Sequence, residues 1–237
     1  MKLEKCDFAK SEITFSGHVI GSGRYGVDPK KVQCVENMKI PTTKREVRQL
    51  LGFFSYFRTY IKDFAEVAHP ITELTKKYVP NQIKWTDDHQ QAFVRLKECL
   101  CNATRLHVIE YGKPCGILVD ASGLAVDCCS IQWDDRGVEK LIAFTSSKVN
   151  PTQMRWSTIE REAYGVIFAL RKFRNFVFLV RITIFSDHNP LLYLKQCAPK
   201  SAKLTLWALT EKRLVTFVLD VDSDGRVKRV EVWTRMC

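Results

Sequence analysis

The chain has 237 residues, of which 46% are hydrophobic and 27% are charged, a composition typical of a globular protein rather than a disordered one. Lysine and arginine number 37 against 26 acidic residues, and the net charge of +11 favours a polyanionic partner. No apolar run approaches the roughly 20 residues of a membrane span. The N-terminus also lacks the apolar stretch of a secretory signal, so we expect a cytoplasmic or nuclear protein with no membrane partner.

The nine cysteines are odd in number and show no repeated spacing. We therefore expect reduced thiols rather than a disulfide framework or a zinc site.

The first part of the chain is predicted to hold short strands followed by helices. Residues 13–15 and 18–20 are typical of two extended runs, and the three glycines that follow indicate tight turns. Asp28 and the proline after it are expected to open a short helix through Val35.

The clearest predicted helix begins at Thr43, which forms a capping-box pattern with Glu46. One face of this helix is apolar. It consists of Val47, Leu50, Leu51, Phe54, Phe57 and Ile61. Basic residues lie elsewhere on the helix, beside Tyr56 and Tyr60, which we expect to be exposed. Such charge usually marks a solvated face, but it also suits a surface that follows a nucleic-acid backbone.

The rest of the chain alternates strands and helices, with a domain boundary expected between residues 78 and 114. The expected elements are helices at 71–77 and from Trp85 to about Leu100, strands at 115–120, 127–133 and 139–145, a helix from Ser157 to about Arg174, a strand at 181–187, a helix near 200–210, and paired strands at 213–221 and 226–233.

Two aspartates, Asp120 and Asp187, each end a predicted hydrophobic strand, where the ligand crevice of an open sheet usually lies. The helix after Ser157 offers a third carboxylate in Glu160 or Glu162. Glu160 fits the capping box of Ser157, whereas Glu162 lies at the edge of the apolar stripe and is better placed to face the strands. The structural alternatives are turn aspartates and a surface ion pair. Converging carboxylates suit Mg²⁺ and, in a basic chain, favour a nuclease or a polymerase.

Many phrases of the sequence resemble one family, the reverse transcriptases of gypsy-type LTR retrotransposons, over roughly residues 5–210. The phrases similar to the segment after the polymerase palm are Phe15-Ser-Gly-His18, Asp28-Pro-Lys-Lys-Val32, Pro41-Thr-Thr-Lys44, Leu51-Gly-Phe-Phe-Ser-Tyr-Phe-Arg58 and Phe64-Ala-Glu66. The phrases similar to the RNase H domain are Trp85-Thr86, Val119-Asp-Ala-Ser122, Trp156-Ser-Thr-Ile-Glu-Arg-Glu162 and Ser186-Asp-His-Asn-Pro190.

The resemblance implies an α/β (α+β) chain in three parts. Residues 1–80 would hold the end of the palm, with a primer-grip-like hairpin, and a small helical thumb-like subdomain. Residues 81–212 would form an RNase H-like mixed sheet flanked by helices, and residues 213–237 a divergent tail. The residues implied to contact nucleic acid are Gly17, His18, Lys44, Arg45, Arg48 and Arg58.

The resemblance also implies a catalytic site. Asp120, Glu162 and Asp187 would bind Mg²⁺ or Mn²⁺ and hydrolyse the RNA strand of an RNA–DNA hybrid.

The sequence departs from the family in three ways. The palm with its catalytic aspartates is not matched, so no autonomous polymerase activity is expected. The fourth carboxylate of the RNase H site is not matched, and Asp127 on a predicted strand is a candidate core defect. A catalytically impaired nucleic-acid-binding remnant is therefore the alternative function, whereas no phrase supports an integrase-like strand transferase.

Overall fold

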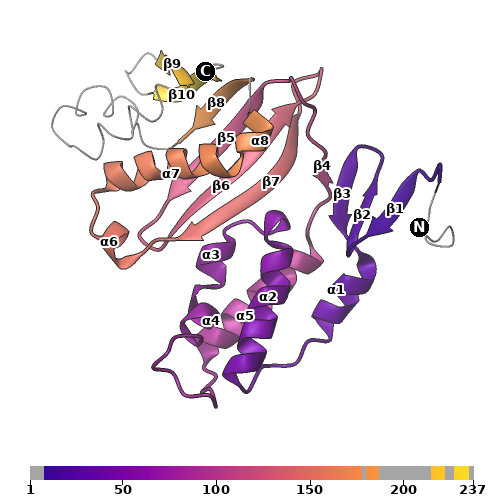
Figure 1. Ribbon diagram of the computed structural model, residues 1–237, viewed down its shortest axis with the longest axis vertical. Helices are drawn as coiled ribbons and strands as arrows, with labels where there is room; N and C mark the ends of the chain where they lie inside the picture. The colour runs from indigo at the N-terminus through magenta and orange to yellow at the C-terminus, as the bar shows by residue number, and fades with distance from the viewer. Residues whose placement is uncertain (1–7, 178–179, 187–214, 222–226, 235–237) are drawn as a thin grey trace. The chain divides into compact units, whose positions relative to one another are not determined.

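The computed structural model, shown in Figure 1, describes residues 8–177, 180–186, 215–221 and 227–234. The chain divides into two compact units. Unit 1 comprises residues 1–61 and 67–108, and unit 2 comprises residues 62–66 and 109–237. The division after Val108 falls within the predicted boundary region of 78–114. Residues 81–108, which the sequence prediction placed with the RNase H-like part, pack with unit 1, because their long helix contacts helices of that unit.

Unit 1 contains a small antiparallel sheet in the order β1-β2-β3-β4. Its strands are β1 (Glu12–Phe15), β2 (His18–Gly21), β3 (Arg24–Val27) and β4 (Leu106–His107). The first two strands were predicted. The glycine-rich stretch after them was expected to form turns, but only Ser22 and Gly23 form one, and the residues that follow become a third strand.

The helices of unit 1 lie between β3 and β4 along the chain. They are α1 (Pro29–Glu36), α2 (Lys44–Tyr56), the 3-10 helix η2 (Arg58–Tyr60), α4 (His69–Glu73) and α5 (Asp87–Cys101). Thr43 caps α2 through the expected capping box with Glu46. The predicted apolar stripe is buried except for half-buried Leu51, but it does not lie on one continuous helix, because Phe57 and Ile61 lie beyond the end of α2, on either side of η2.

Unit 2 is built on a mixed sheet in the order β7-β6-β5-β8-β10-β9. Its strands are β5 (Cys115–Ala121), β6 (Ala125–Trp133), β7 (Glu139–Lys148), β8 (Arg181–Phe185), β9 (Val215–Val221) and β10 (Val227–Thr234). β5 and β8 pair in parallel, and the other neighbours pair antiparallel. The predicted tail therefore adds two strands to this sheet. The expected helix near 200–210 lies outside the described residues.

The helices of unit 2 include α7 (Thr158–Lys172), which lies across the sheet over β5 and β6 (Figure 1). The shorter ones are α6 (Pro151–Met154) and α8 (Arg174–Val177), and α3 (Phe64–Val67) begins in this unit. Gly165 brings α7 close to the sheet, because a Cβ atom there would lie 2.7 Å from Val119 Cγ1. The apolar core of unit 2 fills the space between α7 and the sheet. None of the described helices is long and apolar enough to cross a membrane.

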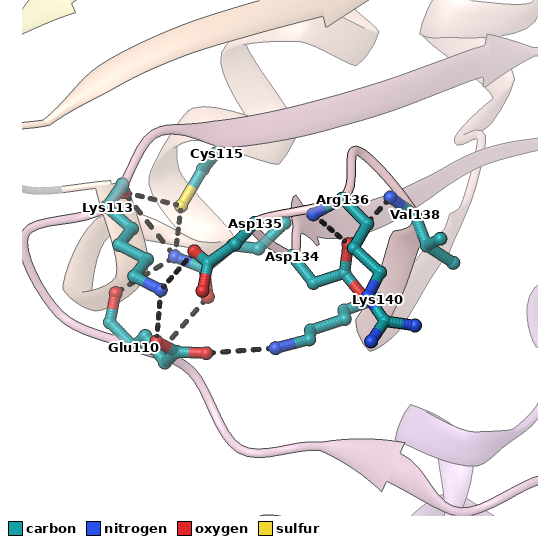
Figure 2. A network of polar contacts seen from close by, with 9 residues as sticks. Glu110, Lys113, Cys115, Asp134, Asp135, Arg136, Val138 and Lys140 are labelled. Carbon is teal, nitrogen blue, oxygen red and sulfur yellow. Dashed lines mark hydrogen bonds and ion pairs between the residues drawn. The ribbon is translucent and has the colours of Figure 1, made fainter.

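A polar network holds the loop before β5 against the β6–β7 hairpin. Figure 2 shows Glu110 between Lys113 and Lys140, with carboxylate–ammonium distances of 2.6 and 3.1 Å. Beneath it, the buried amide of Gln132 accepts a hydrogen bond from Glu110 N and donates one to Glu110 O, both at 2.9 Å. Buried amide groups without partners are costly, so this pairing favours one position of the loop that leads into β5.

Candidate active site

The first candidate carboxylate, Asp120, is placed by the pleat of β5. Ile117, Val119 and Ala121 are buried in the core, while Leu118 and Asp120 are exposed on the opposite face of the strand. Residues alternate between the two faces of a strand, so the buried set fixes the side on which Asp120 lies. The parallel pairing with β8 aligns Leu118 with Phe185. Asp120 therefore lies two residues beyond the last position of β5 that pairs with β8.

The second carboxylate, Glu162, is placed by the start of α7. Ser157 caps this helix, and Glu160 completes the predicted capping box by accepting a hydrogen bond from Ser157 N at 3.1 Å. Glu162 follows two positions later in α7, on the side of the helix that meets the sheet, and it is 2% exposed. Ser186 Oγ donates a hydrogen bond to Glu162 Oε2 at 3.4 Å. The helix carboxylate nearest the end of β8 is therefore Glu162.

The third carboxylate, Asp187, follows Ser186 directly in the sequence but lies outside the described residues. The structure thus brings Glu162 to the end of β8 and places Asp120 on the adjacent parallel strand. We call Asp120, Glu162 and Asp187 the carboxylate site. Within the described ranges, no group of three metal-binding side chains is present. The donors are carboxylate oxygens, which is the ligand chemistry that Mg²⁺ and Mn²⁺ prefer.

A further acidic residue, Asp127, faces Asp120 directly across β5 and β6. Burial raises the pKa of Asp127 to about 7, and the nearby carboxylates of Asp63, Glu66 and Asp120 add to this effect, whereas Lys62 opposes it. Asp127 Oδ1 is buried without a hydrogen-bond donor among the described residues. The sequence prediction treated Asp127 as a core defect. Its position beside Asp120 follows from the register of β5 and β6, which the sequence prediction did not consider.

The same face of the sheet carries a pocket of about 610 Å³. Its lining residues are Lys62, Asp63, Leu118, Val119, Asp120, Asp127, Cys128, Cys129, Phe144, Phe185 and Ser186. Residues 62–66 are held against the sheet, because Ala65 N donates a hydrogen bond to Ser146 Oγ at 2.9 Å. Asp120 therefore lies at a partly apolar hollow and not on a flat surface.

In unit 1, the turn between β1 and β2 carries two of the predicted nucleic-acid contacts. Gly17 has a φ of +79°, a backbone conformation that glycine adopts without strain. His18 lies among the rings of Tyr56, Phe57 and Tyr60. His18 Nδ1 is 2.8 Å from the Tyr60 hydroxyl, and burial lowers the pKa of this histidine. Tyr60 is itself 4% exposed, so the expectation that it is exposed was wrong.

The basic residues predicted on α2 fall into two groups. Lys44 is 6% exposed, and its ammonium donates hydrogen bonds to Lys76 O at 2.7 Å and Val79 O at 2.5 Å. Two of the three donors of this ammonium are thus used within unit 1, and the contact of Lys44 with nucleic acid stays a prediction. Arg45 and Arg48 are exposed, and Arg58 in η2 is half-buried.

The fold and the family comparison define the class of the domain. Residues 85–184 match the model of the RNase H-like domain found in reverse transcriptase. Among solved structures, the foamy viral protease-reverse transcriptase in complex with an RNA/DNA hybrid superimposes with a TM-score of 0.76 at 22% identity. This match covers 88% of this chain and 29% of the viral one. The foamy viral protease-reverse transcriptase dRH in complex with double-stranded DNA gives a TM-score of 0.73, also at 22% identity, and this match covers 85% of this chain and 36% of the viral one. These similarities show the fold.

The sequence relatives are Pol polyproteins of Drosophila melanogaster transposons. The chain is 32% identical to that of transposon opus over 217 residues, which are 87% of this chain and 22% of the relative. It is 34% identical to that of transposon 412 over 202 residues, or 85% and 16% of the two chains. Identity to that of transposon gypsy is 29% over 215 residues, or 86% and 20%. The chain is thus related to retrotransposon Pol polyproteins and spans about a fifth of their length. The predicted resemblance to gypsy-type reverse transcriptases is confirmed.

Proposed function

We propose that this RNase H-like domain of a retroelement Pol polyprotein hydrolyses the RNA strand of RNA–DNA hybrids. The observation that supports this most directly is the contact between Glu162 and Ser186, which joins the buried helix carboxylate to the end of β8. Asp120 lies on the parallel neighbour of β8, and Asp187 is the residue after Ser186. A fold neighbour was solved with an RNA/DNA hybrid, which agrees with this substrate.

The roles of the carboxylates follow from their surroundings. Asp120, Glu162 and Asp187 would hold Mg²⁺ or Mn²⁺, which when bound activates a water molecule and stabilises the departing oxygen of the phosphodiester. Asp120 is exposed on the face of β5 opposite the core, where a substrate can reach it. Glu162 is buried, and the hydrogen bond from Ser186 restrains the direction of its carboxylate. The exposed guanidinium groups of Arg45 and Arg48 would attract the phosphate backbone without reading its sequence.

The test compares cleavage of a labelled RNA–DNA hybrid by the wild-type chain and by three variants in Mg²⁺ or Mn²⁺. Asp120→Asn and Glu162→Gln are expected to lower the cleavage rate by at least about 100-fold while the hybrid still binds. Glu160→Gln is the matched control, because this residue caps α7 and is expected to affect stability more than cleavage. A chelator is expected to stop cleavage. Cleavage that persists unchanged in Asp120→Asn would refute the assignment of the site.

The alternative is a nucleic-acid-binding remnant without catalysis. It is favoured by the net charge of +11 and by the unmatched fourth carboxylate. This function predicts hybrid binding that weakens steeply with salt, because bound phosphates release counterions. It also predicts no cleavage at any concentration of either metal. The same cleavage assay separates the two functions.

A further inference from the structure

Arg161 lies one residue before Glu162 in the first turns of α7, and its guanidinium reaches the turn between β5 and β6. A Cβ atom placed on Gly123, in that turn, would lie 3.2 Å from Arg161 Nη1. Because Gly123 has no side chain, the guanidinium can approach the turn closely. Gly123 follows Asp120 by three residues, so their backbones are separated by at most about 10 Å. Arg161 therefore directly precedes Glu162 in α7, and its guanidinium lies beside the turn that follows Asp120.

The guanidinium of Arg161 is only partly used within the protein. Its Nη2 donates a hydrogen bond to Thr158 Oγ1 at 3.4 Å. Its Nε is buried with no acceptor, and no carboxylate forms an ion pair with it in the part of the chain that the structure describes. Since a guanidinium has five N–H donors in a planar fork, several donors remain for a ligand. A phosphate group matches this fork in charge and geometry.

We propose that Arg161 binds a backbone phosphate of the nucleic-acid strand that enters the carboxylate site. The inference rests on the proposed function, and it adds a substrate-binding residue that the motif resemblance does not assign. Successive phosphates of one strand are separated by about 3.4 Å along the helix axis. The backbones of Gly123 and Asp120 are at most about 10 Å apart, so a guanidinium beside Gly123 can meet a phosphate a few nucleotides from the scissile one. The contact positions the strand and reads no base.

The experiment measures binding of a short fluorescein-labelled RNA–DNA hybrid by anisotropy, with Ca²⁺ in place of Mg²⁺, over a series of salt concentrations. Arg161→Ala is expected to weaken binding about tenfold and to lower the slope of log K against log salt by about one. Arg161→Lys, which keeps the charge, is expected to restore the slope and part of the affinity. The matched control is Arg171→Ala, since Arg171 is an exposed arginine in the last turn of the same helix, and this variant is expected to match the wild type.

The outcomes separate this inference from the proposed function. A wild-type chain that binds the hybrid without cleaving it overturns the proposed function, while the change in slope for Arg161→Ala still supports the phosphate contact. Cleavage by the wild type, together with unchanged affinity and slope in Arg161→Ala, overturns the inference alone. A loss of affinity that Arg161→Lys does not recover, accompanied by a lower melting temperature in both variants, assigns Arg161 a structural role and also overturns the inference.

Discussion

Asp120 and Asp127 are direct register partners on β5 and β6, so their carboxylates lie on the same face of the sheet. Side chains in such pairs are close, and like charges at directly opposite positions are unfavourable. Asp127 carries more of this cost, because it is half-buried and its pKa is raised to about 7, first by burial and then by the surrounding carboxylates.

The first prediction concerns Asp127→Asn, which removes the charge and nearly keeps the shape. Because the pKa of Asp127 is raised in the folded protein, the folded state retains a proton that the unfolded state loses between about pH 4 and pH 7. The free energy of unfolding of the wild type should therefore fall as pH rises through this range. Above pH 7 the variant should be more stable by about 1–2 kcal/mol, since solvent screens part of the cost.

Chemical denaturation of both proteins at pH 4, 5.5 and 7.5 measures this difference. The stability gap between the variant and the wild type should widen with pH. Equal gaps at all three values would contradict the raised pKa of Asp127.

The second prediction compares two glycines inside helices. Gly165→Ala in α7 would place a methyl group 2.7 Å from Val119 Cγ1 and 3.4 Å from Val126 Cγ1, so we expect a loss of about 1–3 kcal/mol. Gly52→Ala in α2 meets nothing within 4 Å and should gain about 0.5–1 kcal/mol from helix propensity. Thermal or urea unfolding measures both changes. A gain in stability for Gly165→Ala would show that α7 does not pack this closely on β5.

The third prediction separates structural from surface basic residues on α2. Lys44→Met keeps the apolar stem but leaves the carbonyls of Lys76 and Val79 without their donor, at a cost of about 1–3 kcal/mol. The double variant Arg45→Ala, Arg48→Ala should unfold within about 0.5 kcal/mol of the wild type.

The effects on hybrid binding should be the reverse of the effects on stability. The double arginine variant should lower the salt slope by about two, whereas Lys44→Met should leave it unchanged. A change in the salt slope for Lys44→Met with no change in stability would instead support Lys44 as a nucleic-acid contact.

The fourth prediction concerns the contact between His18 and Tyr60. Since burial lowers the pKa of His18, the folded state favours the neutral ring, and stability should fall as pH drops below the unperturbed value of 6.5. His18→Phe keeps an aromatic ring among Tyr56, Phe57 and Tyr60 but cannot be protonated, so this part of the pH dependence should disappear. Urea unfolding of both proteins at pH 5 and pH 7.5 tests this prediction. If both proteins lose the same stability between pH 7.5 and pH 5, protonation of His18 is not the cause.

Local signals in the sequence predicted several features correctly. The capping boxes of Thr43 with Glu46 and of Ser157 with Glu160 each depend on residues three positions apart, and both are present. The preference for Glu162 as the inward carboxylate followed from the same cap. These features need no knowledge of distant parts of the chain, because a helix start satisfies its own N–H groups locally.

Features that depend on distant partners could not be predicted in this way. The carbonyls that bury Lys44 lie more than 30 residues later in the sequence. The position of Asp127 beside Asp120 depends on the strand register, which a single sequence specifies only through its pattern of buried residues. The burial of Tyr60 depends on its packing against β2 and β3 through His18 and Tyr25. In each case the exposure or role of one polar or charged residue was predicted without knowledge of the residues that surround it in the fold.

The pairing of β10 with β8 has a consequence for the part of the chain that departs from the family. Val230 pairs with Ile184 and Val232 with Ile182, so β8 has neighbours on both edges, β5 and β10. An uncovered strand edge is a template for association with other molecules. A protein truncated before β9 would expose that edge of β8, and we expect such a protein to aggregate by self-association through this edge.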